Sequence, residues 1–388
     1  MGFIKRHLEK AITASRTYSP VLGVTGPRQS GKTTLLKEMF PDYRYVSLER
    51  LDLRDFAEND PVGFLEEYDR YVIFDEVQRV PDLFSQLQIV VDEEPTVMGR
   101  YILSGSQNFH LMKQITQSLA GRITLFKLLP FDSSELQEAD LLSEDWMEVS
   151  MRGFYPAIYD RGMPSAVFYA NYIQTYVERD LRDLKQVHNL GRFRVFLDLC
   201  AAHAGQLLNL SKLGSLCGIS QPTAKSWLNL LEQSYIVFLL QPYYENFSKR
   251  AVKRPKLYFY DTGLLSFLLG YRKKEDWLHS RRRGQMFENL VIADVFKRNE
   301  HEYALRDYWF WRDAEGREVD LLSKEGERFK LWEMKAGQTV SSGSFKNLNY
   351  FSSLTGEAAI EQLTLVYGGR EAYRRNGILI RPWYAAGQ

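Results

Sequence analysis

A nine-residue run near the start of the chain constrains its fold more than any other feature. It reads GPRQSGKTT, with glycine at the first and sixth positions and Lys-Thr directly after the second glycine. Glycine lets the backbone turn so that successive N–H groups point at a polyphosphate. The run therefore predicts a phosphate-binding loop in which Lys32 reaches the outer phosphates and the Thr33 hydroxyl holds Mg²⁺. Its members are Gly26, Pro27, Arg28, Gln29, Ser30, Gly31, Lys32, Thr33 and Thr34.

Both flanks of this loop suit the prediction. Val21–Thr25 is apolar and reads as a buried strand, and Thr33 to Phe40 reads as a helix. Strand, loop and helix in this order are the context that the motif requires, and the start of the helix adds its positive dipole end. The alternative is a glycine-rich turn with an exposed lysine, which the two flanks disfavour. We therefore expect an α/β fold with a parallel sheet.

Two adjacent acids follow a second apolar run, Tyr71 to Phe74. A buried strand here would carry Asp75 to the sheet edge beside the loop, where a carboxylate can bind Mg²⁺, usually through water. Glu76 would then polarise a water molecule for attack on the γ-phosphate. The alternative is that both acids merely end a strand. The loop upstream favours the catalytic interpretation.

Three further residues are candidates with open alternatives. Ser104 ends a third strand, Arg100–Ser104, and Ser106 follows it, so either hydroxyl can bond the γ-phosphate or the attacking water, or serve ordinary turn chemistry. Arg122 precedes another strand, Ile123 to Leu128. A loop arginine there can act as a finger on the γ-phosphate of a neighbouring copy, which implies a homo-oligomer, or form a surface salt bridge.

The order of these motifs resembles one bacterial and archaeal family. Its members join an AAA-type ATPase domain to a C-terminal domain called DUF4143. The resemblance implies ATP with Mg²⁺ as the ligand and residues 1–150 as the ATPase domain, and it spans nearly the whole chain. Arg152 stands where the family more often has a glycine, a departure that we expect to alter a turn only. The segments that carry the resemblance are Gly26–Thr34, Asp75–Gln78, Leu103–Gln107, Ser118–Arg122, Arg152–Pro156 and Tyr176–Leu181.

The middle of the chain, residues 151–255, contains a pattern that resembles a helix-turn-helix. Gly218 sits where a sharp turn is needed, Ser220 can cap the second helix, and Pro222 suits its first turn. Tyr235 to Tyr244 is apolar and aromatic, like the strands of a wing. We therefore expect a winged-helix domain in this part of the chain.

Such a domain can bind DNA or serve as a connector or protein-docking unit. Only one residue of the second helix is basic, which disfavours sequence-specific binding, whereas the wing can contact phosphates non-specifically. The outward polar residues of the helix are Gln221, Thr223, Lys225 and Ser226, and the basic residues of the wing are Lys249, Arg250, Lys253, Arg254 and Lys256.

The C-terminal region, residues 256–388, carries a second constellation. Glu333 and Lys335 would point to one face of a strand, because side chains alternate with a period of two. Asp320 on a neighbouring strand could then share a divalent metal with Glu333, while Lys335 orients or deprotonates a water molecule or stabilises charge on a phosphate. Glu288 lies in a helical pattern upstream.

This set resembles the Asp…Glu-x-Lys core of restriction-endonuclease-like nucleases, with Glu288 in place of their helix acid. The alternative is a solvated sheet face, against which the apolar neighbours Val319 and Leu321 argue. Two basic stretches, Arg272–Lys274 and Arg281–Arg283, either guide a nucleic-acid backbone or face solvent. Asp261 is expected to cap a helix rather than to do chemistry.

Composition limits the remaining choices. The formal net charge is +1, so any nucleic-acid affinity must come from local patches. Two cysteines are too few for a disulfide framework, and no stretch is apolar enough to cross a membrane, so we expect a cytoplasmic protein. The sequence predicts a Mg-dependent ATPase whose nucleotide state controls nucleic-acid binding or cleavage. The alternatives are a nucleotide-dependent switch for a protein partner and a DNA-binding regulator.

Overall fold

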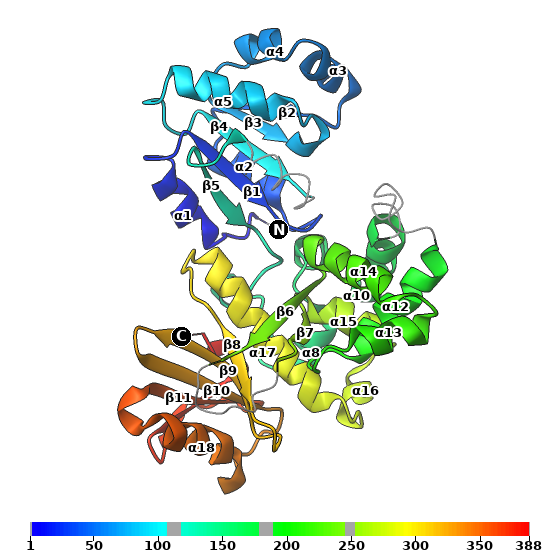
Figure 1. Ribbon diagram of the computed structural model, residues 1–388, viewed down its shortest axis with the longest axis vertical. Helices are drawn as coiled ribbons and strands as arrows, with labels where there is room; N and C mark the ends of the chain where they lie inside the picture. Colours follow the sequence, from blue (N-terminus) through cyan, green and yellow to red (C-terminus); the bar gives the residue numbers. More distant parts are fainter. Residues whose placement is uncertain (1, 107–117, 178–188, 245–252, 388) are drawn as a thin grey trace.

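The computed structural model describes residues 2–106, 118–177, 189–244 and 253–387. They form an upper lobe from the N-terminal third of the chain and a larger lower part that contains the remaining helices and strands (Figure 1). Some residues quoted above lie outside the described ranges. These are Gln107, Glu178–Leu181, Lys249 and Arg250.

The upper lobe is built on a five-stranded parallel sheet in the order β2-β3-β4-β1-β5 (Figure 1). The predicted α/β fold with a parallel sheet is therefore confirmed. β1 and β3 are buried throughout because helices cover both faces, and β1 leads directly into the phosphate loop. The strands are β1 (Val21–Thr25), β2 (Arg44–Ser47), β3 (Val72–Asp75), β4 (Tyr101–Gly105) and β5 (Ile123–Lys127), and the helices are α1 (Leu8–Ser15), α2 (Lys32–Met39), α3 (Leu51–Asn59), α4 (Pro61–Glu67) and α5 (Leu83–Glu93).

The predicted pair of helices in the middle of the chain is present. α13 (Leu210–Cys217) ends at Gly218, whose φ of 63° is in the left-handed region that favours glycine. α14 (Gln221–Gln233) begins after Ser220, whose hydroxyl accepts a hydrogen bond from the Thr223 amide at 3.3 Å. The other helices of this region are α7 (Ser133–Glu138), α8 (Trp146–Arg152), α9 (Pro156–Asp160), α10 (Ser165–Tyr172), α12 (Leu190–Ala202), α15 (Thr262–Leu268) and α16 (Lys274–Leu278).

The strand that the sequence predicts in a wing also belongs to the sheet of the C-terminal region. β6 (Val237–Pro242) pairs antiparallel with β7 (Lys256–Phe259), as a wing strand would, and its end pairs parallel with β8 (Trp309–Arg312). The middle and C-terminal regions therefore share one sheet, in the order β12-β13-β11-β10-β9-β8-β6-β7. Its remaining strands are β9 (Glu318–Glu325), β10 (Arg328–Lys335), β11 (Ile360–Tyr367), β12 (Tyr373–Arg375) and β13 (Ile378–Pro382).

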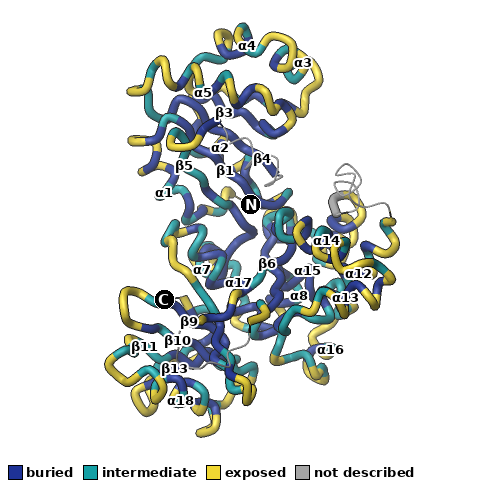
Figure 2. Tube along the Cα trace, in the orientation of Figure 1, coloured by how far each residue is buried: buried dark blue, intermediate teal, exposed yellow. Residues whose placement is uncertain are grey.

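Two helices cover this larger sheet on opposite faces. α18 (Lys346–Thr355) packs on the side of Phe329 and Leu331, and α17 (Arg283–His301) packs on the side of Trp332 and Met334. α17 also contacts β5 of the upper lobe, and Figure 2 shows it buried along much of its length. Among the described residues, no helix combines the length and apolar character needed to cross a membrane.

A single buried carboxylate joins two distant segments of the lower part. Asp261 caps α15 by accepting from the Leu264 amide at 2.8 Å, so the prediction of a capping role is confirmed. Its two oxygens also accept from the Phe154 amide at 2.8 Å and from the Tyr169 hydroxyl at 2.7 Å. Removing this carboxylate would leave two buried amides without this partner and the Tyr169 hydroxyl with only its longer bond to the Arg152 carbonyl, at 3.3 Å.

We therefore expect Asp261→Ala to lower the free energy of unfolding by about 3 kcal/mol, the sum of a lost cap and orphaned donors. Thermal denaturation followed by circular dichroism measures this effect as a lower melting temperature. Asp52→Ala is the control, because Asp52 is exposed and pairs with Arg50 on the surface. Equal melting temperatures for the two variants would contradict the structural role of Asp261.

Candidate nucleotide site and acidic cluster

The phosphate loop lies between β1 and α2 at the carboxyl edge of the upper sheet. Gly26 adopts a φ of 150°, and a Cβ atom at this position would lie 2.1 Å from the Leu128 carbonyl oxygen. Gly31 adopts a φ of 94° directly before α2 begins. The loop conformation therefore requires glycine at both motif positions.

The Lys32 ammonium group is folded over the loop. Its Nζ donates to the Gly26 carbonyl at 2.9 Å and to the Pro27 carbonyl at 2.8 Å. Burial lowers the pKa of Lys32 to about 8, against the opposing effect of the Glu76 and Asp75 carboxylates. A bound polyphosphate would place further anionic oxygens beside this buried cation, in addition to the two nearby carboxylates.

Thr33 and Asp75 meet as the sequence predicts. Thr33 Oγ1 donates to Asp75 Oδ2 at 2.8 Å, so the hydroxyl and the carboxylate form one oxygen-rich pair. The Tyr45 hydroxyl donates to the same carboxylate oxygen at 2.5 Å, and burial together with Asp75 raises the pKa of Tyr45. Sequence reasoning missed Tyr45, because its role depends on the pairing of β2 with β3.

Glu76 is held by two side-chain donors. Its Oε2 accepts from Ser106 Oγ at 3.0 Å and from Gln78 Nε2 at 2.5 Å. Its backbone adopts the left-handed conformation, with φ 55°, which is uncommon outside glycine and concentrates at functional sites. Ser106 therefore lies beside the second acid, whereas Ser104 Oγ is buried without a hydrogen-bond partner among the described residues.

Arg122 lies at the opposite edge of the sheet from its own phosphate loop. It directly precedes β5, whose first residue pairs with the first residue of β1. Its guanidinium forms a two-pronged salt bridge with Asp92, at 2.5 Å and 2.8 Å. Within one chain Arg122 therefore forms a surface salt bridge, which is the alternative to a finger on the γ-phosphate of a neighbouring copy.

A cavity of about 260 Å³ lies beside the phosphate loop. Phe3 and Ile4 supply apolar surface, and Thr34 supplies part of the wall from α2. Pro156 and Asp160 of α9 complete the wall from the lower part of the molecule. The space next to the loop is therefore bounded by both parts of the chain.

Two of the predicted acids of the C-terminal region, Glu288 and Asp320, lie with Glu318 beside a buried lysine. Ligand oxygens of Glu288, Glu318 and Asp320 lie within 4.8 Å of one another. Lys256 Nζ pairs with Glu288 at 2.8 Å and also with Glu318, and Lys256 is only 2% exposed. Although burial opposes it, the attraction of these carboxylates raises the pKa of Lys256. The expectation that Lys256 contacts phosphates from a wing is therefore wrong.

Glu333 and Lys335 lie on one face of β10, as predicted. Lys335 Nζ donates to Glu333 Oε1 at 2.6 Å, while Glu333 Oε2 is buried without a hydrogen-bond partner among the described residues. Asp320 Oδ2 accepts from the Met334 amide at 2.7 Å. Burial and the neighbouring carboxylates raise the pKa of Asp320, and burial raises that of Glu333. The residues present have the oxygen ligands that a hard divalent cation requires.

Several members of the two basic stretches have partners within the protein. Arg282 donates to the Ala202 carbonyl at 2.6 Å, and Arg283 donates to the Ala336 carbonyl at 3.2 Å. Lys274 pairs with Asp145. These three side chains have partners within the protein, which disfavours a role in guiding a nucleic-acid backbone, whereas Lys225 on α14 is exposed.

Three family models match the chain. The model described as an AAA domain matches residues 18–137, the domain of unknown function DUF8612 matches residues 143–275, and DUF4143 matches residues 283–385. Two uncharacterized proteins, from Mycobacterium bovis and Mycobacterium tuberculosis, are each 30% identical over 361 residues. The aligned region covers 92% of this chain and 78% of each relative.

Solved structures show weaker similarity. The Walker-type ATPase of Pyrococcus abyssi is 14% identical with a TM-score of 0.46, and the match covers 69% of this chain and 96% of that protein. The RuvB Holliday junction branch migration motor of Thermotoga maritima is 16% identical with a TM-score of 0.31, covering 60% and 86%. These TM-scores are low, so the fold assignment rests on the strand order described above.

The pairing of Lys256 generates a prediction for the acidic cluster. Lys256→Gln removes the cation that bridges Glu288 and Glu318, although Arg312 still pairs with Glu318, and breaking such a buried pair costs about 3–5 kcal/mol. We expect a lower melting temperature without divalent cations and a larger rise on adding Mn²⁺ than in wild type. Lys330→Gln is the control, because Lys330 on β10 of the same sheet pairs with Glu325 and Glu361. The same response to Mn²⁺ in all three proteins would contradict a cation-binding role.

Proposed function

This chain belongs to the family of proteins that join an AAA domain to a C-terminal DUF4143 domain, and from this premise we propose that it binds and hydrolyses ATP. One observation carries the proposal. The phosphate loop, the Thr33–Asp75 pair and the Ser106–Glu76 pair all lie at one edge of the parallel sheet. This is the edge at which open α/β sheets bind their ligands.

Each residue has a defined task in this proposal. The loop amides and Lys32 bind the phosphates, and Thr33 and Asp75 would hold Mg²⁺, which neutralises charge on the phosphate oxygens. Glu76 polarises the attacking water, and the hydrogen bond from Ser106 holds its carboxylate in place. Because Glu76 is fixed by its own donors, it does not need to reorganise before it acts.

The cavity beside the loop is suited to the base of the nucleotide. Phe3 and Ile4 offer apolar surface for the ring, and Glu38 and Asp160 are acceptors in its lining. Carboxylate acceptors can bind the exocyclic amine of adenine, and they can also bind the N1–H and 2-amino donors of guanine, so the lining does not select the base. We propose ATP as the substrate because the chain contains an AAA domain.

The ATPase proposal is tested by steady-state hydrolysis and by nucleotide binding measured in parallel. Glu76→Gln is expected to lower the hydrolysis rate about 100-fold or more and to keep nucleotide binding, because only the water-polarising group is lost. Lys32→Ala is expected to lose binding as well. Glu49→Gln is the control, since Glu49 is an exposed acid in the same lobe that pairs with Arg79. Equal rates for wild type and Glu76→Gln would contradict the assignment of Glu76.

Arg122 extends this proposal to an oligomer. In a ring or stack of copies, Arg122 would leave Asp92 and reach the γ-phosphate of a neighbouring subunit. Arg122→Ala would then lower hydrolysis while nucleotide binding is kept, in the same assay. An unchanged rate would assign Arg122 to the salt bridge alone.

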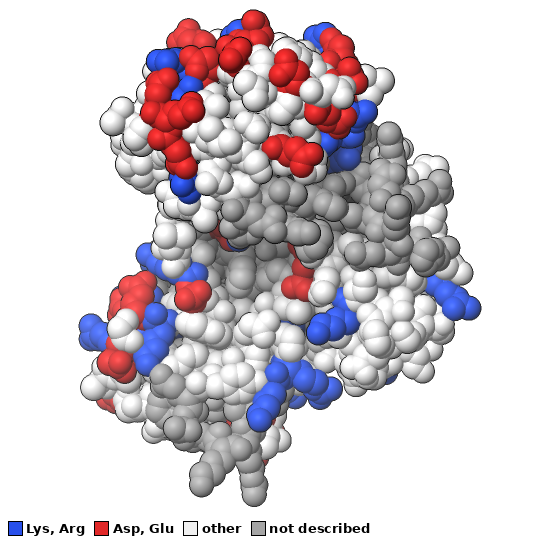
Figure 3. Space-filling model, turned by 45° about the horizontal axis from the view of Figure 1, so that its top comes forward, with Lys and Arg blue, Asp and Glu red and all other residues white. Residues whose placement is uncertain are grey.

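We further propose that the nucleotide state controls non-specific binding or cleavage of nucleic acid. Two features of the chain support this. Helices α12 to α14 followed by the β6–β7 hairpin have the order of a winged helix. Helix α17 and strands β9 and β10 carry Glu288, Asp320, Glu333 and Lys335, the set that resembles the core of restriction-endonuclease-like nucleases. Figure 3 shows acidic side chains gathered on the upper lobe, over α3 to α5, so a nucleic acid would bind the lower part.

The rival function is a nucleotide-dependent switch that binds a protein partner without cleavage. The pairing of Lys256 with Glu288 and Glu318 favours it, because the ammonium group already neutralises part of the acidic cluster. In this alternative the C-terminal region would be a docking unit, and Lys335→Ala would leave its activity intact.

A metal-dependent nuclease assay, with and without ATP, separates the two functions. The coupled-nuclease proposal expects cleavage by wild type and its loss in both Asp320→Ala and Lys32→Ala, since one variant lacks the metal ligand and the other the phosphate-binding group. Equal cleavage by all three proteins would indicate a contaminating nuclease. No cleavage, together with no binding of nucleic acid at low salt, would favour the protein-binding switch.

A further inference from the structure

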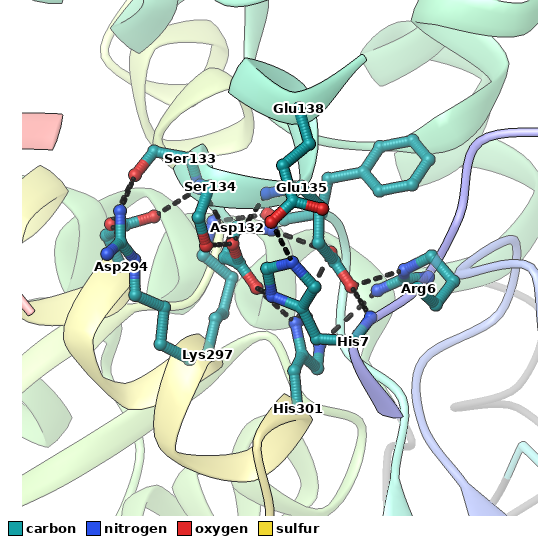
Figure 4. Close-up of polar contacts among 12 residues, drawn as sticks. Arg6, His7, Asp132, Ser133, Ser134, Glu135, Glu138, Asp294, Lys297 and His301 are labelled. Atoms are coloured by element: carbon teal, nitrogen blue, oxygen red, sulfur yellow. Dashed lines mark hydrogen bonds and ion pairs between the residues drawn. The ribbon is translucent and has the colours of Figure 1, made fainter. Parts of the chain in front are cut away.

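We propose that Arg6 is a positioning residue for the phosphate loop, and that the C-terminal region sets its position through His301. The inference rests on the proposed ATPase function and adds a route by which that site is regulated. Arg6 comes from the segment before α1, and His301 is the last residue of α17. The two side chains meet beneath the loop (Figure 4).

Arg6 is bound on every side. Its Nη1 donates to the Ser30 carbonyl of the phosphate loop at 3.0 Å, and its Nη2 donates to the Leu129 carbonyl at 2.7 Å. Its Nε donates to Glu135 Oε1 at 2.9 Å. The side chain is 3% exposed, so these contacts are made away from water. The direction of the guanidinium plane therefore fixes where Ser30, two residues before Lys32, can lie.

The partners of Arg6 are themselves fixed by the start of α7. Asp132 and Glu135 form a capping box: Asp132 Oδ1 accepts from the Glu135 amide at 3.0 Å, and Glu135 Oε2 accepts from the Asp132 amide at 3.1 Å. Although both carboxylates are buried, His301 lowers the pKa of Asp132 and Arg6 lowers the pKa of Glu135. Both acids therefore stay ionised and keep their partners in place.

His301 bridges the capping box and Arg6. Its Nδ1 lies 2.7 Å from Asp132 Oδ2, and its Nε2 lies 3.3 Å from Arg6 Nη2. A guanidinium has no acceptor, so Nε2 accepts from Arg6 only while Nδ1 carries the ring proton and donates it to Asp132. His301 thus adds a contact from α17 to a side chain that Ser30, Leu129 and Glu135 also hold.

The last two turns of α17 are anchored to the same segment. The Asp294 carboxylate accepts from Ser133 N at 2.7 Å and from Ser133 Oγ at 2.6 Å. Lys297 Nζ donates to the Phe131 carbonyl and Arg298 Nη2 to Ser133 Oγ, both at 2.6 Å. These residues recur every three or four positions, so one face of the helix holds residues 131–135. A shift of α17 would therefore break several buried hydrogen bonds or carry this segment, and Arg6, with it.

The other end of α17 connects this network to the acidic cluster. Glu288 lies in the second turn of the same helix and pairs with Lys256. A rigid helix that contacts both sites can couple them, and such coupling is reciprocal for binding. Ligands at the acidic cluster would then alter nucleotide binding, and nucleotide would alter the acidic cluster.

A neighbouring ion pair provides a matched control. Glu300 precedes His301 on α17 and pairs with Lys127 of β5 at 2.6 Å. This contact also links the lower part of the molecule to the upper lobe, but among the described residues neither side chain forms a hydrogen bond or ion pair with Arg6 or with the loop. Glu300→Gln therefore disturbs the same junction without disturbing Arg6.

The test is a double-mutant cycle on kcat and KM for ATP. His301→Gln and Arg6→Gln are each expected to lower kcat/KM about 10- to 100-fold, because the loop is displaced rather than destroyed. The double variant should lose no more than Arg6→Gln alone, since His301 acts through Arg6. Arg6→Lys should recover part of the loss, because an ammonium group can still donate to Ser30, and Glu300→Gln should stay within about twofold of wild type.

Four results are possible besides the expected one. Equal kinetics for His301→Gln and Glu300→Gln would overturn the inference, as would losses that multiply in the double variant. If Arg6→Gln fails to fold, the kcat/KM values of His301→Gln and Glu300→Gln, at adjacent positions, test the inference by themselves. A wild-type protein that does not hydrolyse ATP would overturn the proposed function instead. In that case the affinity for ATP, measured by titration calorimetry, replaces kcat/KM in the same comparison.

Discussion

The buried guanidinium of Arg6 is the interaction on which the arrangement of the two parts depends. A cation that is almost completely removed from water needs charged and polar partners, and Arg6 finds them in Glu135, Ser30 and Leu129. These partners belong to the phosphate loop and to the connection after β5. Because the buried guanidinium needs all of these partners, Arg6 joins the phosphate loop to the connection after β5. Helix α17 holds that connection in turn.

The lower part of the molecule connects this junction to the acidic cluster through one sheet and one helix. β6 belongs to the same sheet as the C-terminal strands, and α17 lies across that sheet between the capping box of α7 and the acidic cluster. Lys256 on β7 pairs with Glu288 on α17, so sheet and helix are also joined by charge. The two candidate sites lie near opposite ends of one helix.

Features carried by neighbours in the sequence were predictable. The phosphate loop, the strand before it and the cap at Ser220 depend on residues within a few positions, and the structure contains all three. Features made by distant residues were not predictable. Lys256 follows a basic run that reads as a solvated wing, yet the carboxylates that surround it come from α17 and β9, more than thirty positions later. Arg6, Tyr45 and Glu318 were missed for the same reason, because their partners are defined by tertiary packing.

Hydrogen–deuterium exchange in the presence and absence of a non-hydrolysable ATP analogue tests the central claim most directly. If Arg6 and His301 link the nucleotide site to the C-terminal region, the analogue will change amide protection in α17, residues 283–301, as well as in the phosphate loop. The change in α17 will be absent in Lys32→Ala, which lacks the phosphate-binding group, and in His301→Gln, which lacks the link. A change confined to residues 18–137 in the wild-type protein would contradict the account.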